Sequence, residues 1–202
     1  MSSDLSPRAL LEEKSLLDIY KKSRRIPFNG FNFWSTLVVS LMVALQYCLL
    51  IGPMSTKLQI VRDFSTVAIG VTATVLGFLL AGFTIFATIS QPDMLVAMSQ
   101  HREQKSGLSF LKYNFFIFMR VFIYYLAYSV FCILIIIFAV KGGLVHRVVS
   151  ISPIAAQICE WLIGVAYVIL YAGFFFLLMQ LKSFIYNVYH SVMTAIRWKA
   201  TL

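Results

Sequence analysis

One carboxylate, Glu160, lies inside the last long apolar run of this sequence. Five side chains recur there every three or four residues and so share one helical face: Gln157, Glu160, Gly164, Tyr167 and Tyr171. A carboxylate within hydrocarbon is costly and usually functional. Glu160 is about two turns from the start of that run, so it can reach the interface or pair with Arg147 in the preceding loop. The alternative is a role in moving a solute or a proton.

A second charge, Arg120, lies within the apolar run before it. Arg120, Tyr124 and Tyr128 fall on one helical face. The long arginine side chain can extend along the helix and place its charge among the headgroups. The alternative is a buried cation that holds a carboxylate or a lipid phosphate. Glu160 is not the expected partner, because the expected topology places it near the opposite leaflet.

A stripe of small residues marks the second apolar run. Its members are spaced three or four residues apart and share one helical face: Gly70, Ala73, Gly77, Ala81, Thr84 and Thr88. Small residues at this spacing allow helix backbones to approach closely in lipid. The stripe therefore predicts helix packing, either within the bundle or between subunits. The alternative is a pore lining or a moving seam. Both predict that this helix is buried in protein rather than facing lipid.

No residue pattern points to an enzyme. Three histidines, His101, His146 and His190, lie on three segments and on both sides of the expected membrane, so they cannot form a metal triad. The motifs of serine hydrolases, zinc proteases and phosphate-binding loops do not occur. The cysteines fall in or beside apolar runs without metal-ligand spacing: Cys48, Cys132 and Cys159. We expect a non-enzymatic protein with no catalytic residue, cofactor or metal.

The composition explains why these residues must be positioned by membrane helices. Of the 202 residues, 60% are hydrophobic and 12% are charged, which is about half the charge of an ordinary soluble domain. A soluble fold of this length cannot hide so much apolar surface. The net charge is +9, but the basic residues cluster beside the apolar runs. Anionic lipids and topology account for them, so we expect no direct nucleic-acid binding.

Four runs are long and apolar enough to cross the hydrocarbon as helices: 33–51, 64–90, 113–140 and 154–181. A surface helix is expected over 6–25, and a short helix over 93–105. Since no strong breaker follows residue 154, the fourth helix should continue to about residue 197 and reach about 65 Å. We expect an all-α polytopic protein that forms a single membrane domain over 1–202.

Charge asymmetry predicts the orientation. Twelve of the 17 lysines and arginines lie on the side that holds both termini, four lie in the opposite loops, and Arg120 lies within a span. This bias places both termini in the cytoplasm, with 1–30, 91–112 and 182–202 on that side. The first residues are polar, so the first span should act as the targeting signal. Four cations beyond the spans form an expected partner face: Arg102, Lys105, Arg197 and Lys199.

Two stretches joined by a short helix resemble small bacterial four-span proteins of defence loci. They are Leu76-Gly77-Phe78-Leu79-Leu80-Ala81-Gly82-Phe83-Thr84-Ile85-Phe86-Ala87-Thr88 and Lys112-Tyr113-Asn114-Phe115-Phe116. Size and layout are similar to the membrane subunit of the Kiwa anti-phage system. The resemblance covers the span layout of the whole chain, and none of its motifs is diagnostic. It implies a homo-oligomer in the bacterial inner membrane that senses phage attack. It also implies a soluble DNA-binding partner docked on the cytosolic face.

Taken together, these features favour a non-catalytic membrane sensor or scaffold. We expect it to form a homo-oligomer through the small-residue face, with a tetramer preferred, and to recruit a cytosolic effector protein. The main alternative is an ion channel or pore that uses the same face with Glu160 at its mouth. A transporter is a third possibility, but the two halves show no matched pair of broken helices.

Overall fold

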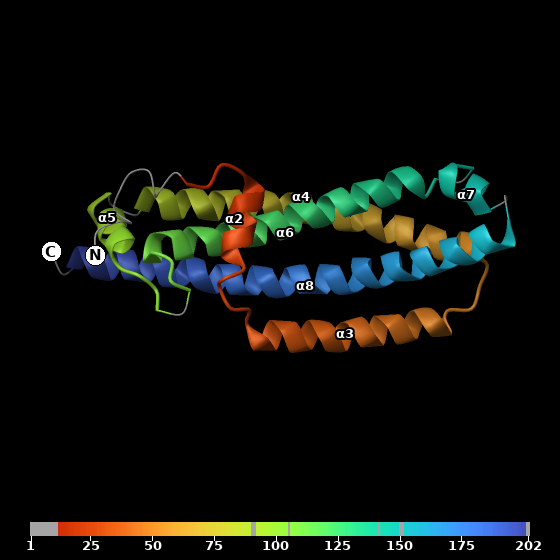
Figure 1. Ribbon diagram of the computed structural model, residues 1–202, viewed down its shortest axis with the longest axis horizontal. Helices are drawn as coiled ribbons and strands as arrows, with labels where there is room; N and C mark the ends of the chain where they lie inside the picture. The colour runs from red at the N-terminus through yellow and green to blue at the C-terminus, as the bar shows by residue number, and fades with distance from the viewer. Residues whose placement is uncertain (1–11, 90–91, 105, 141, 150–151, 201–202) are drawn as a thin grey trace. The chain divides into compact units, whose positions relative to one another are not determined.

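The computed structural model describes residues 12–89, 92–104, 106–140, 142–149 and 152–200, and the named elements of this part are all helices (Figure 1). Four of the helices are long and apolar enough to cross a membrane. The predicted all-α, four-span fold class is therefore confirmed. In chain order the helices are α2 (Leu16–Ser23), α3 (Gly30–Leu49), α4 (Met54–Ile89), α5 (Pro92–Gln100), α6 (Phe110–Phe138), α7 (Leu144–Val149) and α8 (Pro153–Ala200).

Local chemistry explains where the helices begin and end. Ser15 caps α2, because its hydroxyl accepts a hydrogen bond from the Asp18 backbone N–H, and Asn29 caps α3 in the same way. Gly52 and Pro53 separate α3 from α4. Gly107 has a φ of +68°, which permits the tight turn before α6.

The helix boundaries differ from the sequence prediction by two or three residues in α3 and α6 and by more at the start of α4 and the end of α5. α4 begins at Met54, ten residues before the predicted start at 64, because Lys57, Arg62 and Asp63 are compatible with a helix even though they end the apolar run. α5 ends at Gln100 rather than at 105, and Arg102 then pairs with Ser109 in an isolated bridge. α8 has 48 residues, or about 72 Å, so the predicted long fourth helix is confirmed. The N-terminal surface helix predicted over 6–25 is wrong over 12–15, which is not helical, because Ser15 caps α2 at Leu16; the predicted start lies outside the described residues.

The chain groups into two compact units. Unit 1 comprises 1–28, 76–124 and 180–202, and unit 2 comprises 29–75 and 125–179. α4, α6 and α8 each contribute one part to unit 1 and another to unit 2. The expectation of a single membrane domain stays a prediction.

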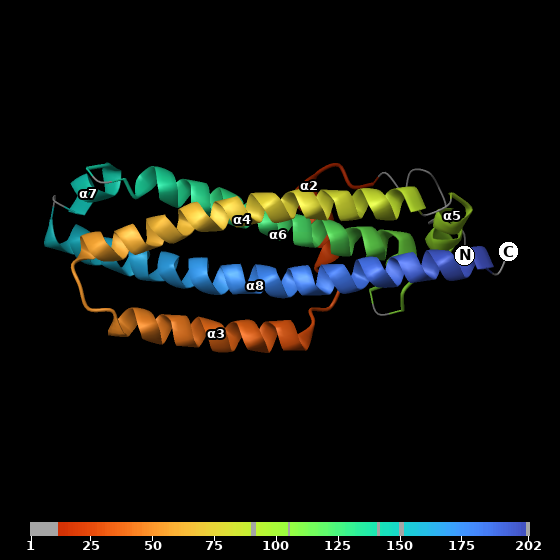
Figure 2. The same cartoon turned by 180° about the vertical axis from the view of Figure 1, so that it is seen from behind.

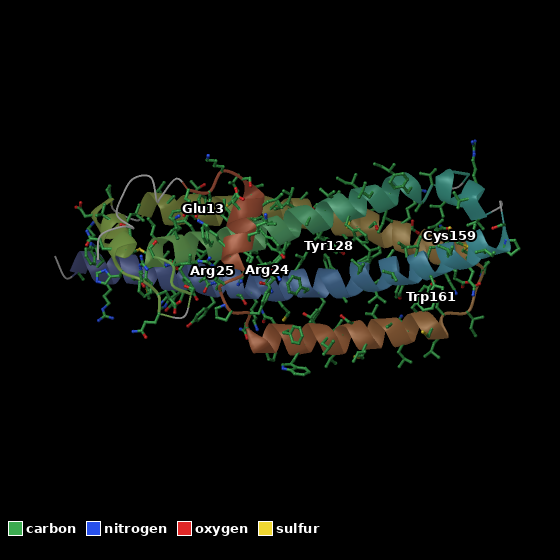
Figure 3. All side chains as sticks on the ribbon, viewed as in Figure 1. Glu13, Arg24, Arg25, Tyr128, Cys159 and Trp161 are labelled. Atoms are coloured by element: carbon green, nitrogen blue, oxygen red, sulfur yellow. The ribbon has the colours of Figure 1, made fainter. Side chains whose placement is uncertain are left out.

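Unit 2 is held together by hydroxyl and amide groups that reach neighbouring helices. The Tyr128 hydroxyl donates to the Leu170 carbonyl at 2.7 Å (Tyr128 is labelled in Figure 3). The Tyr125 hydroxyl donates to the Leu177 carbonyl at 2.9 Å, so both tyrosines join α6 to α8. Asn32 of α3 donates from Nδ2 to the Met179 carbonyl of α8. In an apolar interior such groups need internal partners, so these bonds fix how the helices pack.

Unit 1 contains α2 and α5 together with the remaining parts of the long helices. Phe118 of α6 packs edge-on against Phe86 of α4 and Phe184 of α8, with ring centroids 5.2 and 5.3 Å apart. Gly82 makes room for Phe184, because a Cβ at Gly82 would lie 3.1 Å from that ring. α5 lies beside the C-terminal end of α8 in both ribbon views (Figures 1 and 2).

Candidate functional site

The small-residue stripe of α4 is exposed in the described part of the chain. All six of its members are exposed, whereas the residues about 180° around the helix are buried: Val61, Ser65, Ala68, Thr72, Leu79 and Phe86. A Cβ added at Gly70 or Gly77 would meet nothing within 4 Å. Among the described residues nothing packs on this face, so packing within the chain's own bundle, one of the predicted alternatives, is not seen there and stays a prediction. Contact between subunits stays a prediction.

The hydroxyl groups of the stripe already have partners within α4. Thr84 donates to the Leu80 carbonyl and Thr88 donates to the Thr84 carbonyl, each at 2.9 Å. A threonine that bonds to its own helix presents its methyl group outward. The exposed stripe is therefore narrow, shallow and mostly apolar.

Arg120 is buried and does not extend to the surface of the chain. Only 7% of it is exposed, and Nη1 donates to the Ser23 carbonyl at 3.2 Å and the Ile26 carbonyl at 2.9 Å. The guanidinium also lies over the Phe28 ring, 4.9 Å from its centroid. The extended placement predicted first is wrong. The buried alternative is correct about the location, but the ligands are backbone carbonyls at the end of α2, where a cation suits the helix dipole.

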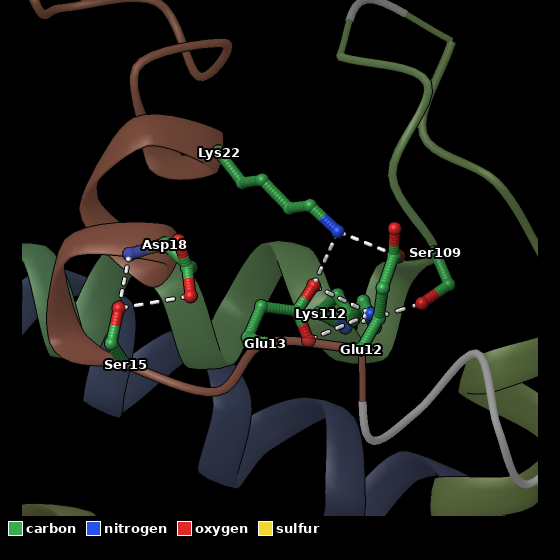
Figure 4. Close-up of polar contacts among 7 residues, drawn as sticks. All are labelled: Glu12, Glu13, Ser15, Asp18, Lys22, Ser109 and Lys112. Carbon is green, nitrogen blue, oxygen red and sulfur yellow. Dashed lines mark hydrogen bonds and ion pairs between the residues drawn. The ribbon is translucent and has the colours of Figure 1, made fainter.

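The other end of α2 is fixed by an ion cluster (Figure 4). Lys112 of α6 donates to both carboxylate oxygens of Glu13, at 2.7 and 2.9 Å, and Lys22 donates to one of them at 2.9 Å. Burial would raise the pKa of the Glu13 carboxyl, but the hydrogen bonds from Lys112 and Lys22 outweigh burial and lower it. Glu12 pairs with the same Lys22 at 2.6 Å. α2 is therefore attached to α6 at both ends.

Glu160 forms an ion pair in unit 2, as one predicted alternative required, but with a different partner. Lys57 Nζ donates to Glu160 Oε1 at 2.8 Å, so the pairing with Arg147 is corrected to Lys57 of α4. Tyr47 of α3 donates from its hydroxyl to the Glu160 carbonyl at 3.2 Å, and Lys57 lies over its ring. The contacts join α3, α4 and α8 at one point, which favours a structural role for Glu160.

Glycine makes this junction possible. A Cβ at Gly164 would lie 2.7 Å from the Tyr47 ring, so only glycine allows Tyr47 to approach α8 this closely. Tyr47 also packs against Tyr167, and Tyr167 packs against Tyr171 at 4.5 Å between centroids. The predicted polar face of the fourth span is thus largely an aromatic contact surface within unit 2.

The predicted cytosolic partner face lies in unit 1. Arg102, Arg197 and Lys199 are exposed there, and Lys105 lies outside the described residues. Arg197 also lines a cavity of about 690 Å³ formed by α4, α5, α6 and α8. His101 and His190 line it as well. Sequence spacing contains no signal that they share a cavity, because 89 positions separate the two residues.

Among the described residues, no group of three potential metal-ligating side chains lies close enough to hold an ion. No protein-family model, curated protein or solved structure matches this chain.

Proposed function

We propose that this protein is a non-catalytic membrane scaffold that forms a homo-oligomer and recruits a soluble protein. The observation that carries the proposal is the outward face of α4. Six small residues lie there in one stripe, opposite the buried face of the same helix. Contacts within the chain do not need small residues at Gly70 and Gly77, since larger side chains would meet empty space. A close contact between α4 and a helix of a second copy would explain why the residues of the stripe are small.

The proposal assigns unit 1 to the cytosolic side, following the excess of lysine and arginine there. Unit 1 carries α2, α5 and the end of α8. Arg102 and Lys199 are exposed cations beyond the apolar runs. Such a surface favours an acidic partner through steering and charge complementarity.

The resemblance to the Kiwa membrane subunit extends this proposal. In this extended proposal the protein is an oligomer, preferably a tetramer, in the bacterial inner membrane. It senses phage attack and binds a DNA-binding effector on its cytosolic face. The effector, rather than this chain, then contacts nucleic acid.

An ion channel is the competing function, because the threonines of α4 and the carboxylate of Glu160 are the groups that a pore would use. However, Thr84 and Thr88 donate to their own helix, and Glu160 is paired with Lys57. These contacts favour a scaffold. Ion flux into liposomes, measured beside partner retention in a pull-down, separates the two functions.

The test of the scaffold uses matched substitutions on α4. Ala81→Leu adds bulk within the stripe, and Ala87→Leu adds the same bulk on an exposed flank of the same helix. Overpacking of a close contact costs about 1–3 kcal/mol. Native mass spectrometry should therefore show dissociated or mixed species for Ala81→Leu and the parent oligomer for Ala87→Leu. A parent oligomer with both variants would contradict assembly through this face.

A further inference from the structure

The cavity of unit 1 has the size and lining of a binding site for an amphiphilic molecule. Its volume of about 690 Å³ lies within the range of small-molecule pockets, about 300–1,000 Å³. Its lining includes the apolar side chains of Phe86, Met94 and Met98 and the nitrogen-bearing side chains of His101, His190 and Arg197. Among the described residues that line it, none is an aspartate or a glutamate. The cavity therefore suits a ligand with an apolar body and an anionic end.

The histidines can serve the anionic end. Nδ1 of His101 lies 3.0 Å from the Ala97 carbonyl oxygen. Because a carbonyl oxygen only accepts, Nδ1 carries a hydrogen, and Nε2 can donate to a phosphate oxygen only when the ring is doubly protonated. The His190 ring stacks on the Tyr186 ring, with 6.3 Å between their centroids. This contact fixes the orientation of the His190 ring on the exposed side of α8. Arg197 adds a permanent positive charge.

The position of the cavity indicates the source of the ligand. Phe86 lies near the end of α4 and Phe110 lies at the start of α6, and both helices are membrane-span candidates. Where spanning helices end, phospholipid headgroups are the nearest anions and acyl chains are the nearest apolar groups. An anionic lipid can enter from the side with its chain against the apolar lining.

We propose that unit 1 binds one anionic phospholipid in this cavity, with its acyl chain along Phe86, Met94 and Met98 and its headgroup phosphate at His101, His190 and Arg197. The site does not depend on oligomerisation, so it can be tested on the monomer. It would make the protein responsive to the lipid composition around it.

Trp198 supplies a reporter, because it lines the cavity. The other two tryptophans, Trp34 and Trp161, are exposed on the apolar surface and would be quenched by any surrounding lipid. In a Trp34→Phe, Trp161→Phe background, Trp198 fluorescence is measured in delipidated protein titrated with brominated phosphatidylglycerol or brominated phosphatidylcholine. Phosphatidylglycerol should quench Trp198 at a concentration about tenfold lower, because both lipids offer a phosphate but only phosphatidylcholine also brings a choline cation, which the charge of Arg197 repels.

Variants assign the effect to the cavity. Ala97→Phe fills the space next to His101 and should abolish quenching, whereas Ala87→Phe lies outside the lining and should leave it unchanged. His101→Gln with His190→Gln should remove the preference for phosphatidylglycerol while circular dichroism stays that of the parent. Equal quenching by the two lipids would overturn the proposal. The proposal would also be overturned if neither lipid quenched Trp198 and the Ala97→Phe variant lost a soluble partner. That result would assign the cavity to a peptide.

Discussion

At the scale of single residues, three ionisable side chains form hydrogen bonds or ion pairs that connect one segment of the chain to another. Arg120 donates to the backbone carbonyls of Ser23 and Ile26. Glu160 is bound to Lys57, and Glu13 is bound to Lys112. The buried charges of Arg120 and Glu13 are tolerated because hydrogen bonds replace their water, whereas Glu160 is exposed. Each of these charges therefore has a structural explanation that requires no reaction.

Replacing Arg120 should release α2. Arg120→Met keeps the volume but leaves the Ser23 and Ile26 carbonyls without their donor, and hydrogen bonds to a charged group are worth about 1.5–3 kcal/mol. Trypsin should then cleave at Lys21 and Lys22 faster than in the parent, as followed by mass spectrometry. Lys199→Met, at an exposed site, is the control. Unchanged cleavage in Arg120→Met would show that other contacts hold α2.

The attachment at Glu13 should depend on pH in a defined direction. Because the folded-state pKa of Glu13 is below its ordinary value of 4.5, the stabilisation is complete above 4.5 and is lost as pH falls through the lower folded value. Amide hydrogen exchange of α2, corrected for intrinsic rates, should be constant from neutral pH to about that ordinary value and accelerate in more acidic solution. Glu13→Gln should show fast exchange throughout. A parent-like profile in this variant would exclude Glu13 as the titrating group.

At the scale of helices, two glycines of α4 have opposite surroundings. A Cβ added at Gly82 would lie 3.1 Å from the Phe184 ring, whereas one added at Gly77 would meet open space. One helix therefore has a face fitted to its own chain and a face that nothing in the described part of the chain covers. Substitutions at the two glycines can therefore distinguish effects on the stability of the monomer from effects on oligomer assembly.

Leucine at these two positions should give different defects. Gly82→Leu should lower the thermal midpoint of the detergent-dissociated monomer, since overpacking costs about 1–3 kcal/mol. Gly77→Leu should leave that midpoint near the parent value and instead shift the oligomer distribution in native mass spectrometry. The reverse pattern would mean that the stripe packs inside the chain.

At the scale of the whole molecule, the two units contain different elements and different polar contacts. Unit 2 contains α3, whose 20 residues extend about 30 Å and so match the hydrocarbon thickness of a bilayer. Unit 1 contains α2, its ion cluster and the cavity. This division fits the proposals that unit 2 crosses the hydrocarbon and that unit 1 binds a phospholipid.

Cysteine labelling should report an N-in, C-in topology. In a background without Cys48, Cys132 and Cys159, Ser55→Cys should react with a membrane-impermeant maleimide in intact cells. Thr201→Cys should react only after lysis, because the excess of lysine and arginine holds the termini inside. Labelling of Thr201→Cys from outside would reverse the orientation and remove unit 1 from the cytosol.

The sequence by itself determined the four long apolar helices, their approximate limits and the great length of α8. These features depend on local properties, namely the length of charge-free runs and the positions of Gly52, Pro53 and Gly107. The sequence also identified the stripe of α4, because helical periodicity alone puts its members on one face.

Only the tertiary structure decided which way each face points and which charges meet. Lys57 and Glu160 are 103 positions apart, and Lys112 and Glu13 are 99 apart. Meetings across such separations depend on how the helices rotate and pack against their neighbours, which a one-dimensional pattern does not encode. For the same reason His101 and His190 could be paired in one cavity, and the α4 stripe could be placed outward, only after the helices were packed.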